Sequence, residues 1–165
     1  TGFGRCGTLF AHELFDVKPD IMTMAKGIGG GVPMGGILAT EKVAGAFVPG
    51  DHGTTFGGGP LVCAAANAVL DAFEEEDILA NVNEVGDYFI EELKKLDKEI
   101  ISDVRGKGLM VGLELTEPGA EYVDKLREAG FLINCTAGKV LRFVPPLIIT
   151  KDEIDEFVKA LDEIL

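Results

Sequence analysis

The feature that most constrains the fold of this chain is the uneven distribution of its glycines: fifteen of the 22 lie within residues 1–60. Its overall share of 22/165, or 13%, is roughly double the usual ~7%. The glycines do not recur at every third position, which excludes a collagen-like helix. A local excess of glycine predicts loops whose backbone adopts left-handed conformations or comes very close to other groups.

The rest of the composition is that of an ordered globular protein. Hydrophobic residues make up 47% and charged residues 26% of the chain, which excludes a disordered tail. No apolar run approaches the ~18 residues that span a bilayer, so no membrane partner is expected. The net charge is −13, and residues 61–165 carry −12 of it (11 basic, 23 acidic side chains). Such an acidic surface repels phosphodiester backbones, so nucleic acid is not an expected partner.

The cysteines and histidines predict neither a metal site nor a disulfide framework. Cys6, Cys63 and Cys135 are odd in number, widely spaced and without a CxxC pair. The two histidines lie in no metal-ligand spacing. Together with the lack of a secretory signal, this pattern predicts a protein of the reducing cytoplasm.

Two short strands and two helices are predicted in the first part of the chain. Residues 20–25 form an apolar run that predicts a buried strand, and residues 35–40 predict a second strand. Pro60 suits the first turn of a helix, and helical apolar spacing follows it to Phe73. A second helical stripe covers residues 78–96. The acidic run between the helices is expected to be a solvated turn.

From residue 100 onward, short strands alternate with helices. Thr150 and Glu153 form a capping box before the last helix. We expect an α/β chain in two parts, residues 1–96 and residues 97–165. The expected strands of the second part cover residues 100–104, 109–115, 131–135 and 140–144, and its helices cover residues 119–129 and 154–165.

The heptapeptide at residues 1–7 contains GxGxxG, the dinucleotide-binding pattern. That pattern binds a pyrophosphate only where a strand precedes it and a helix follows, and Phe3 and Arg5 would crowd the ligand. A dinucleotide site is therefore a weak interpretation. The only serine, Ser102, lacks the GxSxG context of a hydrolase nucleophile.

Lys26 is more informative, because it ends an apolar run and is followed by four glycines in five positions. A lysine in a desolvated place is a nucleophile toward carbonyl groups, and glycines allow a bulky planar ligand to come close. The alternative is an ordinary surface lysine at the end of a strand.

Two further segments carry residues suited to binding anions. Arg142 alternates with Leu141 and Phe143 before a Pro-Pro pair, so it could hold a carboxylate with two parallel hydrogen bonds. Residues 51–60 place two threonines before a helix N-terminus, which suits a phosphate. A surface ion pair and simple helix capping remain the alternatives.

These segments together resemble class III pyridoxal-phosphate aminotransferases. The likeness is carried in order by four blocks spread over nearly the whole chain: residues 1–7, residues 18–21 with 25–27, residues 52–58, and residues 134–137 with 141–147. The resemblance implies the end of a fold-type I cofactor domain with its connecting helices, residues 1–96. A small C-terminal α+β domain, residues 97–165, would follow it.

The resemblance also implies roles for four residues. Lys26 would be the catalytic residue that binds pyridoxal 5'-phosphate covalently. Thr55 would hydrogen-bond the cofactor phosphate across the interface of a homodimer, and Thr54 would lie near the substrate. Arg142 would grip the α-carboxylate of the amino-acid or 2-oxo-acid substrate.

The activity implied is transfer of an amino group from N-acetylornithine to 2-oxoglutarate, a step of arginine biosynthesis. Alternatives are ornithine, 4-aminobutyrate or a lysine-pathway intermediate as donor, or a non-catalytic chain that retains the fold. Two positions depart from the family pattern: Gly59 stands where asparagine is frequent, and Cys6 where threonine is common.

The chain begins at Thr1, so we expect it to be part of a longer protein. In the family, a segment just before this position supplies an aspartate that pairs with the pyridine nitrogen of the cofactor. Without that aspartate the cofactor is a poor electron sink. Residues 1–165 alone are therefore expected to be inactive.

Overall fold

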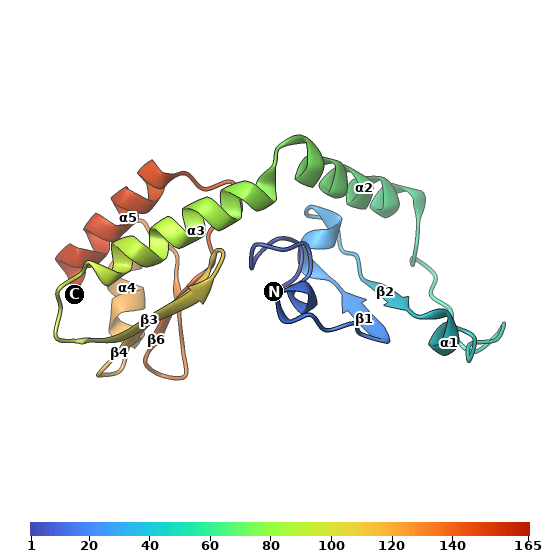
Figure 1. Cartoon of the computed structure of the whole chain (residues 1–165), viewed down its shortest axis with the longest axis horizontal. Coiled ribbons are helices and arrows are strands. Elements are labelled where there is room, and N and C mark those ends of the chain that lie inside the picture. The colour runs from blue at the N-terminus through green and yellow to red at the C-terminus, as the bar shows by residue number, and fades with distance from the viewer.

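The computed structural model describes all of residues 1–165. Figure 1 shows two halves joined by two long helices, α2 (Pro60–Glu75) and α3 (Ile78–Lys94). The N-terminal half lies beneath α2 and the C-terminal half lies beneath α3. No helix combines the length and the apolar character needed to cross a membrane. The mixture of strands and helices confirms the predicted α/β class.

The N-terminal half contains one pair of strands and several short helical turns. Strand β1 pairs antiparallel with β2, from Ile21 opposite Ala39 to Met24 opposite Gly36. Both strands were predicted from their apolar runs, within one residue at each end. The elements of this half are η1 (Ala11–Phe15), β1 (Ile21–Met24), η2 (Lys26–Gly29), β2 (Gly36–Ala39) and α1 (Glu41–Ala44).

The prediction that residues 20–25 form a buried strand is wrong for this chain. Ile21 is 52% exposed, and the residues of β1 alternate between exposed and half-buried. The reason is that β1 and β2 form a sheet of only two strands. An apolar run predicts a strand, but its burial depends on other layers of the structure.

The two predicted helices are confirmed, with a short acidic link between them. Pro60 occupies the first position of α2, where its missing N–H breaks no helical hydrogen bond. The link consists of Glu76 and Asp77, and Asp77 has a left-handed backbone with φ 49°. One face of α3 is buried, and it comprises Ile78, Val82, Val85, Gly86, Phe89 and Leu93.

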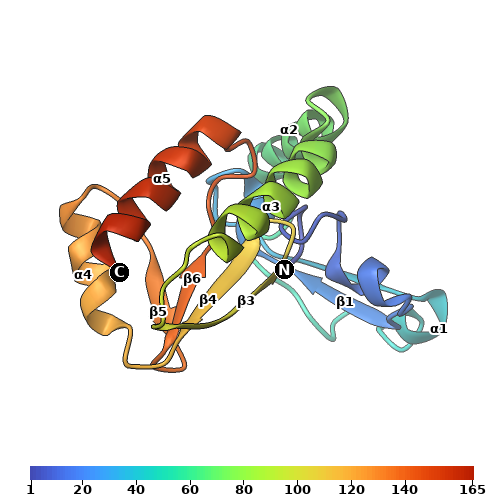
Figure 2. The same ribbon diagram turned by 60° about the vertical axis from the view of Figure 1, so that its left-hand side comes forward.

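An antiparallel sheet of four strands forms the C-terminal half, in the order β3-β4-β6-β5. Helices α3 and α5 lie over one face of it, and α4 packs beside β5 and α5 (Figure 2). Figure 2 also shows that α4 and α5 lie on the side away from β1. The elements are β3 (Ile101–Lys107), β4 (Met110–Leu115), α4 (Ala120–Glu128), β5 (Asn134–Thr136), β6 (Val140–Phe143) and α5 (Lys151–Ile164).

Two strand boundaries in this half differ from the prediction by three residues, and the others agree within one residue. The strand expected at residues 100–104 continues to Lys107, because Lys107 still pairs with Met110 across the hairpin. The hairpin turn is therefore only Gly108 and Leu109. The strand expected from residue 131 begins at Asn134 instead.

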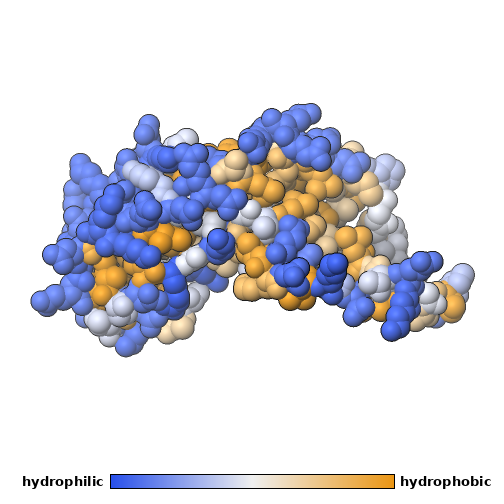
Figure 3. Space-filling model, in the orientation of Figure 1, coloured by the Kyte–Doolittle hydropathy of each residue, from blue (hydrophilic) through white to orange (hydrophobic).

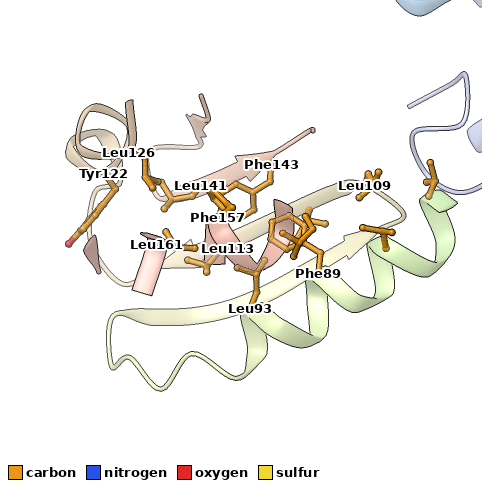
Figure 4. Close-up of a cluster of buried hydrophobic side chains, with 14 of the residues drawn as sticks. Phe89, Leu93, Leu109, Leu113, Tyr122, Leu126, Leu141, Phe143, Phe157 and Leu161 are labelled. Atoms are coloured by element: carbon orange, nitrogen blue, oxygen red, sulfur yellow. The ribbon is translucent and has the colours of Figure 1, made fainter. Parts of the chain in front are cut away.

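The hydrophobic core lies between this sheet and its helices, where sixteen buried residues form one cluster. In β4, Val111, Leu113 and Leu115 are at most 1% exposed, and the residues between them face the other side. Figure 4 shows Phe89 and Leu93 of α3 pointing toward the sheet, among side chains from α5 and β6. The helix that the sequence places before residue 97 thus packs on the sheet that follows it. The division into parts at residues 96 and 97 remains a prediction.

The N-terminal half, by contrast, exposes much apolar surface. Figure 3 shows a broad hydrophobic area over this half. Of the thirteen large exposed hydrophobic side chains, ten belong to residues 15–70, among them Phe56 at 89% and Phe15 at 76%. Contiguous apolar surface of this kind is typical of interaction sites and ligand-binding grooves.

A first prediction concerns the core beneath α5. Leu161 is 0% exposed, so Leu161→Ala removes buried methyl groups and leaves a cavity. We expect the free energy of unfolding to fall by about 2–5 kcal/mol, measured by urea denaturation. Leu132 is 88% exposed, and Leu132→Ala serves as the control, with an expected change within about 0.5 kcal/mol. Equal effects of the two substitutions would contradict the described core.

A second prediction concerns the capping box of α5. The backbone N–H of Thr150, and then its hydroxyl, lower the pKa of Glu153. A lowered pKa stabilises the folded state above the ordinary value of about 4.3, and this stabilisation is lost as the pH falls. Glu153→Gln should therefore destabilise the protein at pH 7, with a difference that shrinks below about pH 4. Glu163→Gln, at the other end of α5, is the control, and a pH-independent effect of Glu153→Gln would refute this account.

Candidate active site

Lys26 is the first residue of η2 and is separated from the end of β1 by a single residue, Ala25. Its φ of 57° is left-handed, a conformation that a lysine rarely adopts. Such strain persists only where the surrounding structure enforces it, and it gathers at functional sites. The side chain is exposed in this chain, so the expected lysine leaving a buried strand is not what the structure contains.

A hollow of about 550 Å³ lies beside Lys26. Its volume falls in the range of about 300–1,000 Å³ that is typical of small-molecule sites. Phe3 and Phe10 contribute aromatic rings to its lining, packed edge to face with centroids 5.3 Å apart. The hollow is also lined by residues 21–27, so it extends along the whole of β1.

The glycines after Lys26 allow its turn to pack against α2. Gly30 has φ 56°, and a Cβ added to it would lie 2.8 Å from Cγ2 of Val69. Ile28 packs with Phe3 and Ala66 in a small buried cluster. The glycine-rich stretch at residues 27–31 is therefore needed for close packing against α2, as well as for the turn itself.

Thr54 and Thr55 lie in the irregular loop between α1 and α2, and both are exposed. Figure 1 shows α1 and this loop at the end of the molecule farthest from the C-terminal half. The hollow beside Lys26 is lined by neither threonine. Within one chain, the structure does not bring these predicted residues to the lysine.

Arg142 lies on β6, on the face of the sheet opposite the core. Its Nε donates a hydrogen bond to Oδ1 of Asn134 on β5, with a distance of 3.1 Å. The predicted alternation is confirmed, because Leu141 is 0% and Phe143 3% exposed while Arg142 is half-buried. On β4, Gly112 stands opposite Arg142.

A second arginine, which is not among the predicted site residues, lies on the same face of the sheet. Arg105 on β3 also stands opposite Gly112, so its backbone lies about 10 Å from that of Arg142, two strand spacings away. Its Nη1 donates to Oδ2 of Asp103 and Oε2 of Glu114, both at 2.7 Å. These hydrogen bonds, that to Asp103 first, raise the pKa of Arg105. A hollow of about 300 Å³ is lined by both arginines.

The sequence predicts a strand that ends at residue 104, so Arg105 falls outside it and is not among the predicted site residues. The signal was present in the alternation itself: a strand that continues to Lys107 places Arg105 on the same face as Asp103. Gly112 carries no side chain, so it leaves the space between the two arginines open. The predicted residues thus lie in separate places, with Lys26 and Arg142 lining different hollows.

The GxGxxG pattern does not form a dinucleotide site. Residues 2–10 are turns and bends, and the next element is the short 3-10 helix η1 rather than an α-helix. Gly4 and Gly7 have positive φ and approach the two long helices closely. An added Cβ would lie 2.4 Å from Cε1 of Phe73 at Gly4, and 2.1 Å from Oδ1 of Asn83 at Gly7.

Comparison with known proteins places this geometry in one family. The family model of class-III aminotransferases matches residues 1–165. The chain belongs to the class-III aminotransferase family.

Particular relatives lie in the same family. An acetylornithine aminotransferase of Aquifex aeolicus is 56% identical over 165 residues, which are 100% of this chain and 43% of the relative. One of Methanothermobacter thermautotrophicus is 50% identical over 167 residues, again 100% of this chain and 43% of the relative. The chain thus spans less than half the length of these relatives.

Solved structures resemble the whole chain closely. An ornithine aminotransferase from Plasmodium yoelii superposes with a TM-score of 0.93 and 34% identity, over 99% of this chain and 45% of that one. An acetylornithine aminotransferase from Elizabethkingia anophelis gives 0.92 and 35% identity, over 99% and 43%. These likenesses confirm the predicted fold, that of a fold-type I transferase.

Proposed function

We propose that the full-length protein is a pyridoxal-phosphate-dependent aminotransferase that moves an amino group from N-acetylornithine to 2-oxoglutarate, as in arginine biosynthesis. The observation that carries this proposal is Lys26, a strained lysine at the end of a strand, beside a hollow of small-molecule size. The family and the names of relatives at 50–56% identity point to the same chemistry.

The residues around Lys26 fit the cofactor. A primary amine is the group that a pyridoxal carbonyl binds, and the hollow of about 550 Å³ has aromatic lining for a flat ring. Lys26 would hold the cofactor covalently, and Thr55 would hold its phosphate. When bound, pyridoxal phosphate supplies an electron sink for negative charge at the reacting carbon.

Lys26 has a second task once an amino substrate has displaced it. Its Nζ takes the proton from the substrate carbon that bears the amino group, and later returns a proton to the acceptor carbon. This work requires a base within hydrogen-bond reach of that carbon. The left-handed backbone of Lys26, fixed by the packing of Ile28 behind it, sets the direction in which the side chain leaves the turn.

Arg142 binds the substrate carboxylate. Its hydrogen bond to Asn134 uses Nε, which leaves the two terminal nitrogens to form a pair of parallel bonds with a carboxylate. The neighbouring cation, Arg105, already donates to Asp103 and Glu114. Arg142 is therefore the stronger anion site of the pair.

Thr54 and Thr55 act in a homodimer, in the active site of the other subunit. Their exposed loop lies beside the apolar surface of the N-terminal half, and the next residue, Phe56, is 89% exposed. A second copy packed on that surface would bury these side chains and bring Thr55 toward a cofactor phosphate. The three cysteines are unpaired, which suits the reducing cytoplasm as the place of this enzyme.

A second candidate is an aminotransferase acting on ornithine, because the structure superposes with the Plasmodium yoelii ornithine aminotransferase at a TM-score of 0.93. Donors such as 4-aminobutyrate or a lysine-pathway intermediate belong to the same class. Rates of the full-length enzyme with these donors, each with 2-oxoglutarate, separate the candidates. A rate highest for ornithine would replace the N-acetylornithine assignment.

A third prediction tests Lys26. In the full-length protein, borohydride treatment with pyridoxal phosphate should fix the cofactor on Lys26, located by peptide mass spectrometry. Lys26→Ala should abolish both this attachment and transamination, because no other amine occupies that position. Lys94→Ala, on the exposed side of α3, is the matched control and should retain both. Specific attachment and full activity in Lys26→Ala would refute the proposed function.

A fourth prediction tests Arg142. Arg142→Ala removes a charged pair of hydrogen bonds and should weaken binding of 2-oxoglutarate by about 1.5–3 kcal/mol. Titration of the cofactor absorbance with 2-oxoglutarate measures the affinity. Arg127, on α4, pairs with Asp124 at the surface, so Arg127→Ala should leave the affinity unchanged. Unchanged affinity in Arg142→Ala would remove Arg142 from the site.

A further inference from the structure

Arg5 joins the N-terminal segment to two separate points of the C-terminal half. Its Nη1 donates to the carbonyl oxygen of Leu109 at 3.1 Å and to that of Pro145 at 2.5 Å. The backbone N–H of Leu109 donates in return to the carbonyl oxygen of Arg5, at 3.0 Å. The side chain is partly buried, and this burial lowers the pKa of its guanidinium.

Both acceptors lie beside the ends of two paired strands: β6, which contains Arg142, and its neighbour β4. Leu109 immediately precedes β4, the strand whose Gly112 stands opposite Arg142. Pro145 follows Arg142 by three residues, just after the end of β6. A single guanidinium thus holds the start of one strand and the end of its neighbour.

On its other side, the same segment packs against the turn that carries Lys26. Phe3 is 9% exposed and forms a buried cluster with Ile28 and Ala66. Phe3 also lines the hollow beside Lys26. Residues 3–5 therefore link the turn that carries Lys26 to the sheet that carries Arg142.

The backbone around Arg5 leaves little room for another arrangement. A Cβ added to Gly108 would lie 2.7 Å from the carbonyl carbon of Cys6 and 2.8 Å from the nitrogen of Gly7. One added to Gly86 of α3 would lie 2.4 Å from the oxygen of Gly108. Three stretches of backbone thus meet where only glycine fits.

We propose that Arg5 is a positioning residue that fixes Arg142 relative to Lys26, and so sets where the α-carboxylate of a substrate lies. This inference rests on the proposed function. Arginine suits the task because its guanidinium reaches two carbonyl oxygens and is more weakly hydrated than an ammonium group. Residues 2–7, which contain the GxGxxG pattern, therefore connect the two halves of the molecule.

The test compares two acceptors that differ only in the α-carboxylate: 2-oxoglutarate, and succinate semialdehyde, which lacks it. Arg5→Lys in the full-length enzyme should weaken single-turnover use of 2-oxoglutarate by about tenfold and change succinate semialdehyde by less than about twofold, since tenfold corresponds to one lost hydrogen-bond contribution. The double variant with Arg142→Ala should be no worse than Arg142→Ala alone. Arg127→Lys, at an exposed site, is the control.

A second readout does not depend on activity. Hydrogen exchange of the Leu109 amide, which donates to Arg5, should accelerate in Arg5→Lys and not in Arg127→Lys. If Arg5→Lys does not fold, Arg5→Gln is the second variant: it removes the charge but leaves an amide N–H that can donate to one carbonyl oxygen, and it should show the same selective loss.

Three results would overturn the inference. Equal losses with both acceptors would show a general loss of structure, and additive losses in the double variant would show that Arg5 acts independently of Arg142. Unchanged kinetics in Arg5→Lys would show no positioning role. A wild-type enzyme that cannot use 2-oxoglutarate would overturn the proposed function itself, which the first measurement reveals before any variant is made.

Discussion

The structure depends on the contact between α3 and the four-stranded sheet. Val82, Phe89 and Leu93 are at most 1% exposed, so this face of the helix is sealed against β3 and β4. Burial of one face of the sheet determines which residues face the other side, because side chains alternate along a strand. Arg142 is held on the outer face for this reason. The middle of the same helix, at Gly86, touches Gly108, which in turn contacts the backbone of Cys6 and Gly7. Helix α3 therefore also contributes to the contact between the two halves.

The two hollows have different physical origins. The one beside Lys26 follows a strained turn that packs tightly on α2, and its walls come from the first 27 residues. The one beside Arg142 exists because Gly112 interrupts a row of side chains across three strands. Lys26 thus lies in the N-terminal half and Arg142 in the C-terminal half. Their relative position depends on the contacts that join the two halves, those of Arg5 among them.

Sequence patterns predicted those features of the helices that depend on residues close together in the chain. The helix start at Pro60 and the capping box of Thr150 were predicted because helix N-termini depend on the residues immediately around them. Helix α5 itself begins at Lys151, three residues before the predicted start at residue 154. The burial of β1 was predicted wrongly, since exposure depends on layers distant in sequence. Arg105 was missed for a related reason: the length of β3 is set by its pairing with β4, which the residues of β3 alone do not reveal.

The sequence by itself determined the family, the helices, and the kinds of side chain available for chemistry, because motifs and periodicity are local properties of the chain. Only the tertiary structure decided how these residues are distributed in space. In the folded chain, Thr55 does not line the hollow beside Lys26, and Arg105 lines the same hollow as Arg142. The segment with the GxGxxG pattern does not form a dinucleotide site but connects the two halves through the hydrogen bonds of Arg5. The physical reason is that hydrogen bonds and close contacts between residues about a hundred positions apart arise only when the chain has packed.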